Sequence, residues 1–527
     1  MCLALPWLAA CGEAGSDDAG TPELRAALFD TILARTERRE SFSGLKNELL
    51  GFDPLDEMRA LRDTVVGAAS ENDLYYALAR LSNARRDRHL EVLLVPGGIQ
   101  PADVAGLAIW DGEAPLPRQA PVRVFPDYST NEMVYFVGDV APDERWPDLP
   151  RAGDRIVTIN GLPAASWHLS GAPYMRHSTE AGLRWKLAEA MTQSTAVFPL
   201  ELRAEPLRLA VQSAEGAIDS LEVPFVDPAE LTWTGVAEPH YPGLTLERST
   251  PTYDLLMPAE QPADLPFLVL VWRGFRETMV ADVDTLTALA EREGLLDHSV
   301  IVDVTRSRGG SLGAHALQRL QPRPFRTTFG NLRLSDVIPA FVEEKRAEFE
   351  ARDVNDGGVP ETVDDGTWLM EWLEEEVLPA LEAGAEYSTE VPFKLAHAPR
   401  ESDGVLDPAP VHFRGAFAVI SGPSGGSHLD QFVAIVVDNG LGPVVGMPAG
   451  GYSNTWEWQE ILHFPGTEQP VVGFMWSIGS TIRPNGEVLE GNPADVDEWV
   501  PLTRENVERY YALLLERALA GIRSVER

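Results

Sequence analysis

The chain has 527 residues, a length that suits roughly two to four domains with proper cores. Apolar residues make up 44% of the chain and charged residues 24%, which are ordinary proportions for a soluble globular protein. The 81 acidic and 43 basic residues give a net charge of −38, which argues against nucleic acid as a partner.

Both cysteines, Cys2 and Cys11, lie near the start of the chain. A short apolar run leads to residues 8–11, LAAC, and small and acidic residues follow, an order that resembles the lipobox of bacterial lipoproteins. The basic residues that normally precede the apolar run are missing, so an ordinary signal peptide or a ragged terminus stays open. We expect residues 1–20 to be a lipoprotein signal and tether, with Cys11 lipidated and the chain held at the bacterial cell envelope, facing the periplasm or the cell surface. No other segment reaches the roughly 18 apolar residues that span a bilayer.

Residues 21–97 are predicted to form an N-terminal helical region. Three segments, 24–40, 56–69 and 72–87, carry apolar residues at three- and four-residue spacing, and Asn72 and Asp73 are typical helix-start residues. His89 follows at a junction between helix and strand. A lone histidine in such a place is usually a surface residue or a satisfied polar group.

Residues 98–235 change to short alternating strands broken by proline and glycine, which predicts a β-rich domain. Its clearest part is a Gly153-Asp154 turn, an alternating strand over 155–159 and an Asn160-Gly161 turn. This pattern is similar to the Gly-Asp…Ile-Asn-Gly signature of PDZ domains, which bind extended chain ends at a sheet edge.

Residues 236–527 alternate strands and helices, as in an α/β core. Apolar runs at 267–272, 299–304 and 417–420 predict buried strands, and an acidic stretch at about 336–390 predicts a helical insertion on the surface. A long amphipathic helix is expected over 504–522. The predicted fold class is therefore α/β and multidomain.

Ser427 stands at the turn between the strand at 417–420 and an apolar helix predicted over 429–438. Helix-terminal N–H groups and the helix dipole favour negative charge there, so a serine alkoxide or the oxyanion of an acyl-transfer intermediate would be stabilised. The plainer interpretation is that Ser427 and Asp430, three residues apart, form a helix-capping pair.

Taken in order, these pieces resemble the tail-specific, or C-terminal-processing, serine peptidases and their tricorn-core relatives. Residues 303–310, DVTRSRGG, are similar to the family's Asp-Leu-Arg-x-Asn-x-Gly-Gly segment, although the arginine and asparagine are not in their places. Residues 425–433, GGSHLDQFV, are similar to the segment Ser-Ala-Ser-Ala-x-Glu-x-Phe-Ala that carries the nucleophile. The resemblance implies a ClpP/crotonase-like peptidase core that acts on peptides or unfolded protein tails, without cofactor or metal.

The resemblance also assigns the site, with one departure. Tail-specific proteases use a lysine base, but Tyr452 stands at its position and no lysine follows Lys394. Tricorn-like members use an N-terminal histidine and a C-terminal glutamate instead, and His89 and Glu490 are similar to these. Ser427 is then the nucleophile, with His89 as general base and Glu490 orienting it.

Backbone N–H groups of Gly310 and His428 would form the oxyanion hole. The imidazole of His428 is a rival base, disfavoured because neighbouring helix residues point in different directions. A Tyr452 phenol, mostly protonated near pH 7, is less suited still. Glu487 and Asp495 compete with Glu490 for the role of the acid.

Two other functions stay open. The lost lysine and the unusual residues 425–428 also fit a catalytically inactive relative that binds peptides or another ligand as a surface lipoprotein. An esterase with the same nucleophile is a third possibility, although the Gly-x-Ser-x-Gly elbow of α/β-hydrolases is absent around Ser427.

Overall fold

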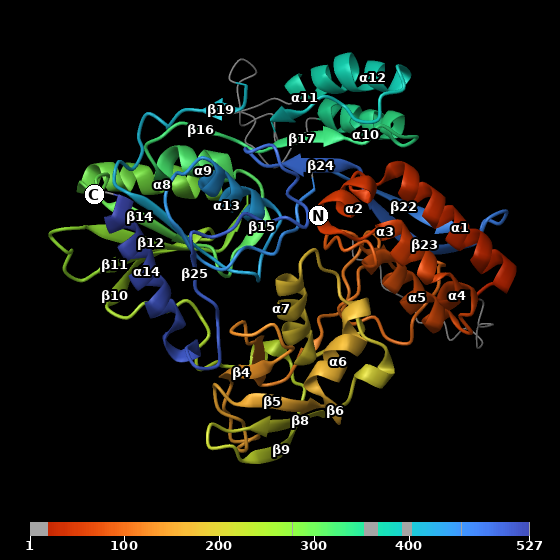
Figure 1. The fold of residues 1–527 in the computed structure, drawn as a ribbon, viewed down its shortest axis with the longest axis horizontal. Coiled ribbons are helices and arrows are strands. Elements are labelled where there is room, and N and C mark those ends of the chain that lie inside the picture. The colour runs from red at the N-terminus through yellow and green to blue at the C-terminus, as the bar shows by residue number, and fades with distance from the viewer. Residues whose placement is uncertain (1–18, 277, 352–366, 393–402, 455, 526–527) are drawn as a thin grey trace, which may run out of the picture.

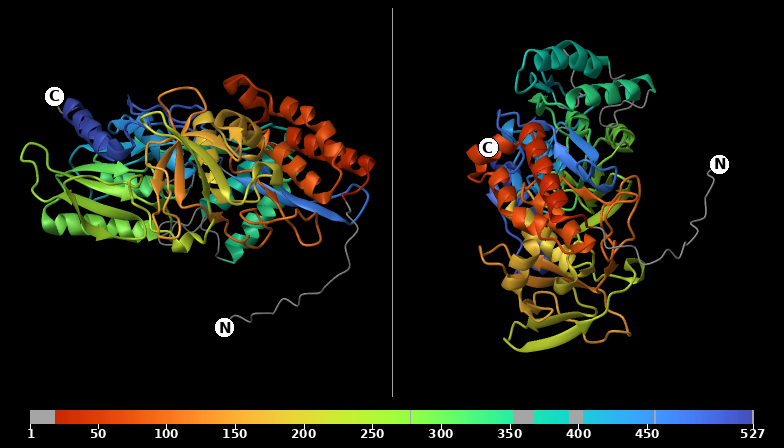
Figure 2. Two further views of the ribbon diagram at one scale, coloured as in Figure 1. Left: turned by 90° about the horizontal axis from the view of Figure 1, so that it is seen from below. Right: turned by 90° about the vertical axis from the view of Figure 1, so that its right-hand side faces the viewer.

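The computed structural model describes residues 19–276, 278–351, 367–392, 403–454 and 456–525. The predicted lipidation site, Cys11, lies outside these ranges. Figure 1 shows the α/β core on the left, a β-rich lobe below it, the N-terminal helices on the right and a pair of insertion helices above. In the right-hand view of Figure 2 the insertion helices and the β-rich lobe lie at opposite ends of the molecule.

A seven-stranded sheet forms the core. Its strands, in spatial order, are β10 (Leu244–Ser249), β11 (Tyr253–Pro258), β12 (Phe267–Trp272), β14 (Ser299–Asp303), β20 (Phe417–Ser421), β21 (Val444–Gly446) and β25 (Glu498–Trp499). The strands from β12 to β25 run parallel, whereas β10 and β11 are antiparallel to their neighbours. Parallel strands are covered on both faces, so successive residues of β12, β14 and β20 are all apolar.

Helices cover both faces of this sheet. One face packs against α8 (Thr278–Glu293), α9 (Gly313–Leu320) and α13 (His428–Asp438), and the other packs against α14 (Tyr510–Val525). Asp303 at the end of β14 pairs with Ile420 near the end of β20, so the turns that follow these two strands emerge side by side. That edge of a parallel sheet is where α/β proteins place their sites.

The β-rich lobe, which we call the β lobe, is an antiparallel sheet with two helices. Its elements are β3 (Val122–Pro126), β4 (Tyr135–Val140), β5 (Arg155–Ile159), β6 (Leu162–Pro163), β8 (Leu207–Gln212) and β9 (Ile218–Val223), with α6 (Ala164–Gly171), α7 (Glu180–Met191) and the β2 (Arg118–Gln119)–β7 (Gln193–Ser194) pair. Ile159 pairs with Leu162 across Asn160 and Gly161, which have φ angles of 51° and 83°. The predicted Asn-Gly turn is therefore confirmed, because a two-residue hairpin of this type needs positive φ at both positions.

The N-terminal helices and the insertion helices share one apolar core. The helices are α1 (Pro22–Arg39), α2 (Ser43–Leu50), α3 (Pro54–Ala60), α4 (Arg62–Val66), α5 (Glu71–Asn83), α10 (Ile338–Glu350), α11 (Thr367–Trp372) and α12 (Leu378–Glu382), beside the sheet β1 (Val92–Leu93), β23 (Pro470–Ser477) and β22 (Glu457–His463). The rings of Trp372 and Trp456 stack at 5.5 Å in this core. The insertion is thus acidic on one face and packed on the other.

Three small sheets complete the structure. They are β13 (Gly274–Phe275) with β15 (Arg308–Gly310), β16 (Phe325–Arg326) with β19 (Val405–Leu406), and β18 (Val391–Pro392) with β17 (Phe329–Leu332) and β24 (Gly479–Ile482). None of the described helices combines the length and apolar character needed to cross a bilayer.

Two predicted helix starts lie close to the observed ones. Asn72 and Asp73 are in the first turn of α5, which begins at Glu71 after the cap residue Ser70, whose hydroxyl accepts the N–H of Asp73. The last α-helix begins at Tyr510, directly after a 3₁₀ turn at Val507–Arg509. Thr503 and Asn506 bond each other's backbone N–H groups in the turn that leads into it.

Candidate active site

Ser427 is the residue before α13 and has an unusual backbone conformation, with φ 62° and ψ −127°. An ordinary N-cap serine has extended φ and ψ and accepts a helix N–H with its hydroxyl. The Ser427 side chain makes no such bond. A non-glycine residue in this part of φ/ψ space carries a conformational strain of about 1–3 kcal/mol, and such residues cluster at functional sites. The predicted capping pair is therefore present only in part: Asp430 interacts with the Ser427 N–H, whereas the Ser427 hydroxyl is not engaged in a cap.

Asp430 also ties the serine turn to a second loop. Its buried carboxylate accepts the N–H groups of Gly451 at 3.0 Å and Tyr452 at 3.1 Å. The N–H of Ser427 donates to the carbonyl oxygen of Tyr452 at 2.6 Å. Burial raises the pKa of Asp430 to about 7, although the N–H groups around it oppose the shift. The Ser427 turn and the 451–452 loop thus form one hydrogen-bonded unit.

Two glycines of β15 lie against this unit. A Cβ atom on Gly309 would stand 2.6 Å from the Cβ and 3.1 Å from the Oγ of Ser427. Gly310 has a φ of 141°, and a Cβ there would stand 1.9 Å from the carbonyl oxygen of Phe275. Neither position tolerates a side chain, so the peptide between them approaches Ser427 as a bare backbone. The role of the Gly310 N–H as an oxyanion donor stays a prediction.

His428 is the first residue of α13, so its N–H lies at the positive end of the helix dipole. Its imidazole is buried and turned toward α9, where its Nε2 accepts the N–H of Gly313 at 2.7 Å. The ring also packs edge-on against Phe275, with centroids 5.4 Å apart. Because the Nε2 lone pair is already used, the His428 side chain does not suit the role of rival base.

His89 and Glu490, which are 401 positions apart in the sequence, lie together in the structure with Asp87. Each of the three residues offers one side-chain nitrogen or oxygen atom, and these three atoms all lie within 4.8 Å of one another. The Oδ1 of Asp87 accepts the backbone N–H of His89 at 2.9 Å and is 3.8 Å from its Nδ1. The Oε2 of Glu490 accepts the N–H of Ser453 at 2.7 Å. The histidine therefore has two buried carboxylates beside it.

The two other acids considered for the Glu490 position lie elsewhere. Glu487 and Asp495 are both exposed, and Glu487 pairs with Arg483 at 3.5 Å. Glu490 is buried beside His89. Burial and the neighbouring Asp87 raise the pKa of Glu490 above its ordinary value.

A lysine that the sequence did not point to completes this cluster. The Nζ of buried Lys46 lies 3.5 Å from the Oε1 of Glu490 and donates to the carbonyl oxygens of Arg85 at 2.9 Å and Arg86 at 2.8 Å. The Asp87, His89 and Glu490 side chains are also suitable metal ligands. The Lys46 ammonium already supplies a positive charge next to Glu490, which opposes binding of a further cation there.

Tyr452 contacts both the serine turn and the histidine. Its ring packs edge-on against that of His89, with centroids 5.1 Å apart, and a Cβ on Gly426 would stand 2.1 Å from it. The Arg88 guanidinium lies 4.4 Å from the centre of the same ring. Burial raises the pKa of the Tyr452 phenol, so it stays protonated near neutral pH and is a poor base. Ser427 bonds the backbone carbonyl of this residue and His89 packs on its ring, so both predicted groups contact Tyr452.

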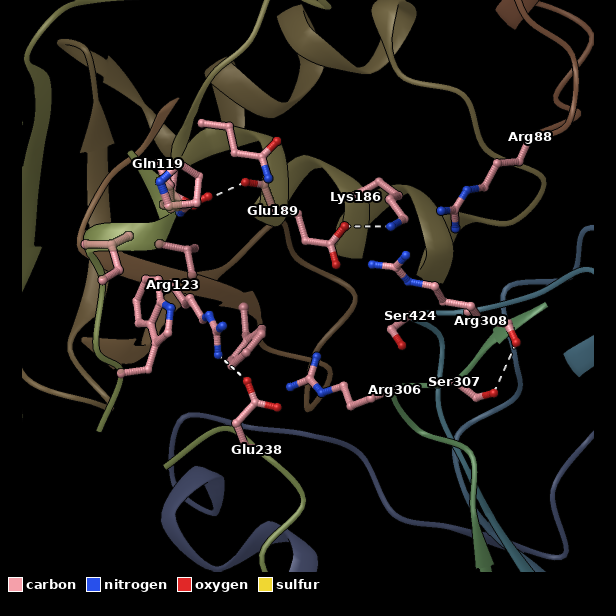
Figure 3. Close-up of a pocket in the computed structure, with 18 of the residues that line it drawn as sticks. Arg88, Gln119, Arg123, Lys186, Glu189, Glu238, Arg306, Ser307, Arg308 and Ser424 are labelled. Atoms are coloured by element: carbon pink, nitrogen blue, oxygen red, sulfur yellow. Dashed lines mark hydrogen bonds and ion pairs between the residues drawn. The ribbon is translucent and has the colours of Figure 1, made fainter. Parts of the chain in front are cut away.

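A pocket of about 720 Å³ opens beside the serine turn, between the core and the β lobe (Figure 3). Gly309, Gly425 and Tyr452 form its wall on the core side. The hydroxyl of Ser424, which also lines it, donates to the carbonyl oxygen of Thr305 at 2.5 Å. The pocket is large enough to take several side chains of an extended peptide.

The sequence matches no protein-family model and no curated protein. Among solved structures, the chain is similar to mature CPAF, with a TM-score of 0.69 and 13% identity over 95% of this chain and 97% of that chain. Mature CPAF complexed with lactacystin matches with a TM-score of 0.69 and 14% identity over 94% and 97%. The photosystem II D1 C-terminal processing protease covers 93% of this chain and 97% of its own at 13% identity, with a TM-score of 0.42. The likeness to CPAF at this identity shows a shared fold, and it confirms the predicted α/β multidomain class.

Proposed function

We propose that this chain is a serine peptidase that hydrolyses peptide bonds in peptides or unfolded protein tails. Ser427 is the nucleophile, His89 the general base and Glu490 the acid that orients the base. The observation that carries the proposal is the strained Ser427 turn, whose hydroxyl does not cap its own helix. A structural serine would use that hydroxyl in the cap.

In the proposed reaction, His89 moves a proton from the Ser427 hydroxyl to the leaving amine. A serine hydroxyl is a weak nucleophile near neutral pH, so it needs an adjacent base. Neutral His89 takes the proton as Ser427 Oγ attacks the carbonyl carbon, and returns it to the leaving amine as the acyl-enzyme forms. Water, activated by the same imidazole, then releases the acyl group.

Two further sets of groups stabilise charge in this scheme. Glu490 and Asp87 lie beside the imidazolium that forms on His89 and favour it electrostatically. The backbone N–H groups of Gly310 and His428 bind the oxyanion, at about 3 kcal/mol for each donor. The 3.8 Å between the Nδ1 of His89 and Asp87 is longer than a hydrogen bond, and we expect it to shorten when substrate binds.

The β lobe has a substrate-binding role in this proposal. Its α7 and β3 line the pocket beside the serine turn, through residues such as Lys186 and Val124. An extended peptide that adds to the lobe, in the way that PDZ domains bind chain ends, would lead into the pocket.

The test is covalent labelling with a fluorophosphonate, read by intact mass and peptide mapping. We expect one adduct, on Ser427, lost in Ser427→Ala and strongly slowed in His89→Ala and Glu490→Gln. Ser424→Ala is the matched control, because this serine lies in the same loop and its hydroxyl is held by a carbonyl group. A folded protein that takes no label would refute the peptidase and leave a peptide-binding protein on the same fold.

We also propose that Cys11 anchors the chain to the envelope as a lipoprotein. Growth of the expressing bacterium with an alkyne fatty acid should label the wild-type chain and the Cys2→Ser variant. The label should be lost in Cys11→Ser. Equal labelling of Cys11→Ser and wild type would exclude this anchor.

A further inference from the structure

The pocket beside the serine turn carries a charge opposite to that of the whole chain. Five cationic side chains and two carboxylates line it, whereas the protein has a net charge of −38. The charged lining residues are Arg88, Arg123, Lys186, Arg306, Arg308, Glu189 and Glu238. Folding has therefore gathered an excess of positive charge in the pocket beside the proposed nucleophile.

The two carboxylates of the pocket are already neutralised. Lys186 Nζ lies 2.6 Å from Glu189, and Arg123 pairs with Glu238. Burial lowers the pKa of Lys186, and the pairing with Glu189 opposes this shift. The other three cations of the pocket have no carboxylate at ion-pair distance among the described residues.

The three remaining arginines make their direct contacts with neutral groups, and Glu189 acts on Arg88 and Arg306 only at longer range. Arg306 donates to the carbonyl oxygen of Ala237 at 2.8 Å, and its guanidinium lies 4.6 Å from the ring of Trp185 and 5.0 Å from that of Phe125. Stacking on aromatic rings fixes a guanidinium and leaves its outer N–H groups able to bind an anion.

Arg88 and Arg308 line other parts of the pocket wall. The Nη1 of Arg88 is buried and makes no hydrogen bond, while its guanidinium lies over the Tyr452 ring. Arg308 is exposed, and its side chain forms no ion pair with any described residue. Figure 3 shows Arg88, Arg306 and Arg308 directed into the pocket around Ser424.

We propose that this arginine trio, Arg88, Arg306 and Arg308, binds acidic side chains of the substrate, so that the peptidase prefers segments rich in aspartate and glutamate. The inference rests on the proposed function, since it names the substrate class of that site. Guanidinium groups bind carboxylates through paired, charge-assisted hydrogen bonds. A buried guanidinium with no carboxylate in direct contact gains more from such a partner than a solvated one does.

Because the whole chain is strongly acidic, an acidic substrate needs a local region of positive charge in order to bind. Acidic peptides are repelled by a surface of −38, and a local concentration of positive charge in a cleft offsets the repulsion where the peptide must bind. The carboxylate of a chain end has the same chemistry as an aspartate side chain. The experiment must therefore separate the two sources.

Binding is measured on the full chain carrying Ser427→Ala, so that the result does not depend on catalysis. The probes are a short unstructured peptide with several glutamates, its twin with glutamines and its twin with lysines, each with a free and an amidated C-terminus. They carry an uncharged fluorophore, and anisotropy is followed at low and high salt.

We expect the glutamate peptide to bind about tenfold more tightly than the glutamine twin, whether or not its C-terminus is amidated, and to weaken in high salt. Arg308→Gln should remove most of this preference and leave the glutamine twin unaffected, and Arg308→Glu should shift the preference toward the lysine twin. Arg292→Gln is the control, because Arg292 is exposed on α8 and pairs with its neighbour Glu293.

Equal binding of the glutamate and glutamine peptides would overturn the inference. A preference that disappears on amidation would also overturn it, because the chain-end carboxylate would then be the ligand. Fluorophosphonate labelling of Ser427 in the wild-type chain is scored separately. Labelling without acidic preference refutes the arginine trio alone, and acidic preference without labelling refutes the peptidase alone.

Discussion

Replacing Lys46 with methionine tests the buried ion pair behind the proposed catalytic acid. Methionine keeps most of the side-chain volume and removes the ammonium that lies 3.5 Å from Glu490. The side chains of Lys46 and Glu490 are 3% and 0% exposed, so water cannot replace the lost partner. The carbonyl oxygens of Arg85 and Arg86 lose a donor in the same substitution.

The expected cost is large for a single substitution. Removing one partner of a buried ion pair costs about 3–5 kcal/mol where the other group is charged, which for Glu490 holds above its pKa of about 8. The double variant Lys46→Met/Glu490→Gln should recover part of this loss, since no buried charge then remains. Lys345→Met is the control: Lys345 pairs with Glu348 at 2.9 Å on one helix, a contact worth about 0.2–0.5 kcal/mol.

The effect should also depend on pH with a definite sign. Burial already raises the pKa of Glu490 in the folded state, and loss of Lys46 raises it further. A folded state that binds protons more tightly than the unfolded state loses stability as pH rises above the unfolded pKa of the carboxyl, about 4.3. Wild type and variant lose this stability in parallel until the wild-type carboxyl ionises near its pKa of about 8, so the Lys46→Met cost should be smaller near pH 7 than near pH 9.

Chemical denaturation of the wild type, both single variants, the double variant and the control supplies the free energies of unfolding. A cost equal to that of Lys345→Met would refute the buried pair. A cost independent of pH would show that the lost carbonyl hydrogen bonds, and not the charge of Glu490, account for it.

Three other outcomes are expected. Gly309→Ala should abolish fluorophosphonate labelling, because the new methyl group would stand 2.6 Å from the Cβ of Ser427. The circular dichroism spectrum should stay that of the wild type. Unchanged labelling would exclude the close approach of Gly309 to Ser427. His89→Ala should lower the labelling rate about 10²–10⁴-fold. Tyr452→Phe should lower it only slightly, because burial raises the pKa of the phenol and keeps it protonated. An equal loss of labelling in both variants would indicate that Tyr452 acts as the base. Burial raises the pKa of Asp430 to about 7, so it binds a proton more tightly when folded, and stability should fall as pH rises from about 4 to 7. Asp430→Asn should flatten that part of the denaturation profile, and an unchanged slope would assign it to other groups.

Much of the core is predictable from the sequence because its signals are local. The strands β12, β14 and β20 are continuous apolar runs, and turns rich in glycine end them. A strand that ends in a small-residue turn before an apolar helix predicts where Ser427 stands, since strand and helix periodicity need no knowledge of distant residues. The same holds for the Asn160-Gly161 hairpin.

Other features are visible only in the tertiary structure. Lys46 and Glu490 are separated by 444 positions. The arginine trio comes from the loop after α5, the turn after β14 and the start of β15. Nothing in the spacing of such residues encodes their contact, because it arises when separately folded elements pack. The choice of Glu490 over Glu487 and Asp495 follows from burial beside His89. The unused hydroxyl of Ser427 follows from its φ of 62°, a strain that a local cap would have avoided and that the loop holding Tyr452 imposes through its hydrogen bonds.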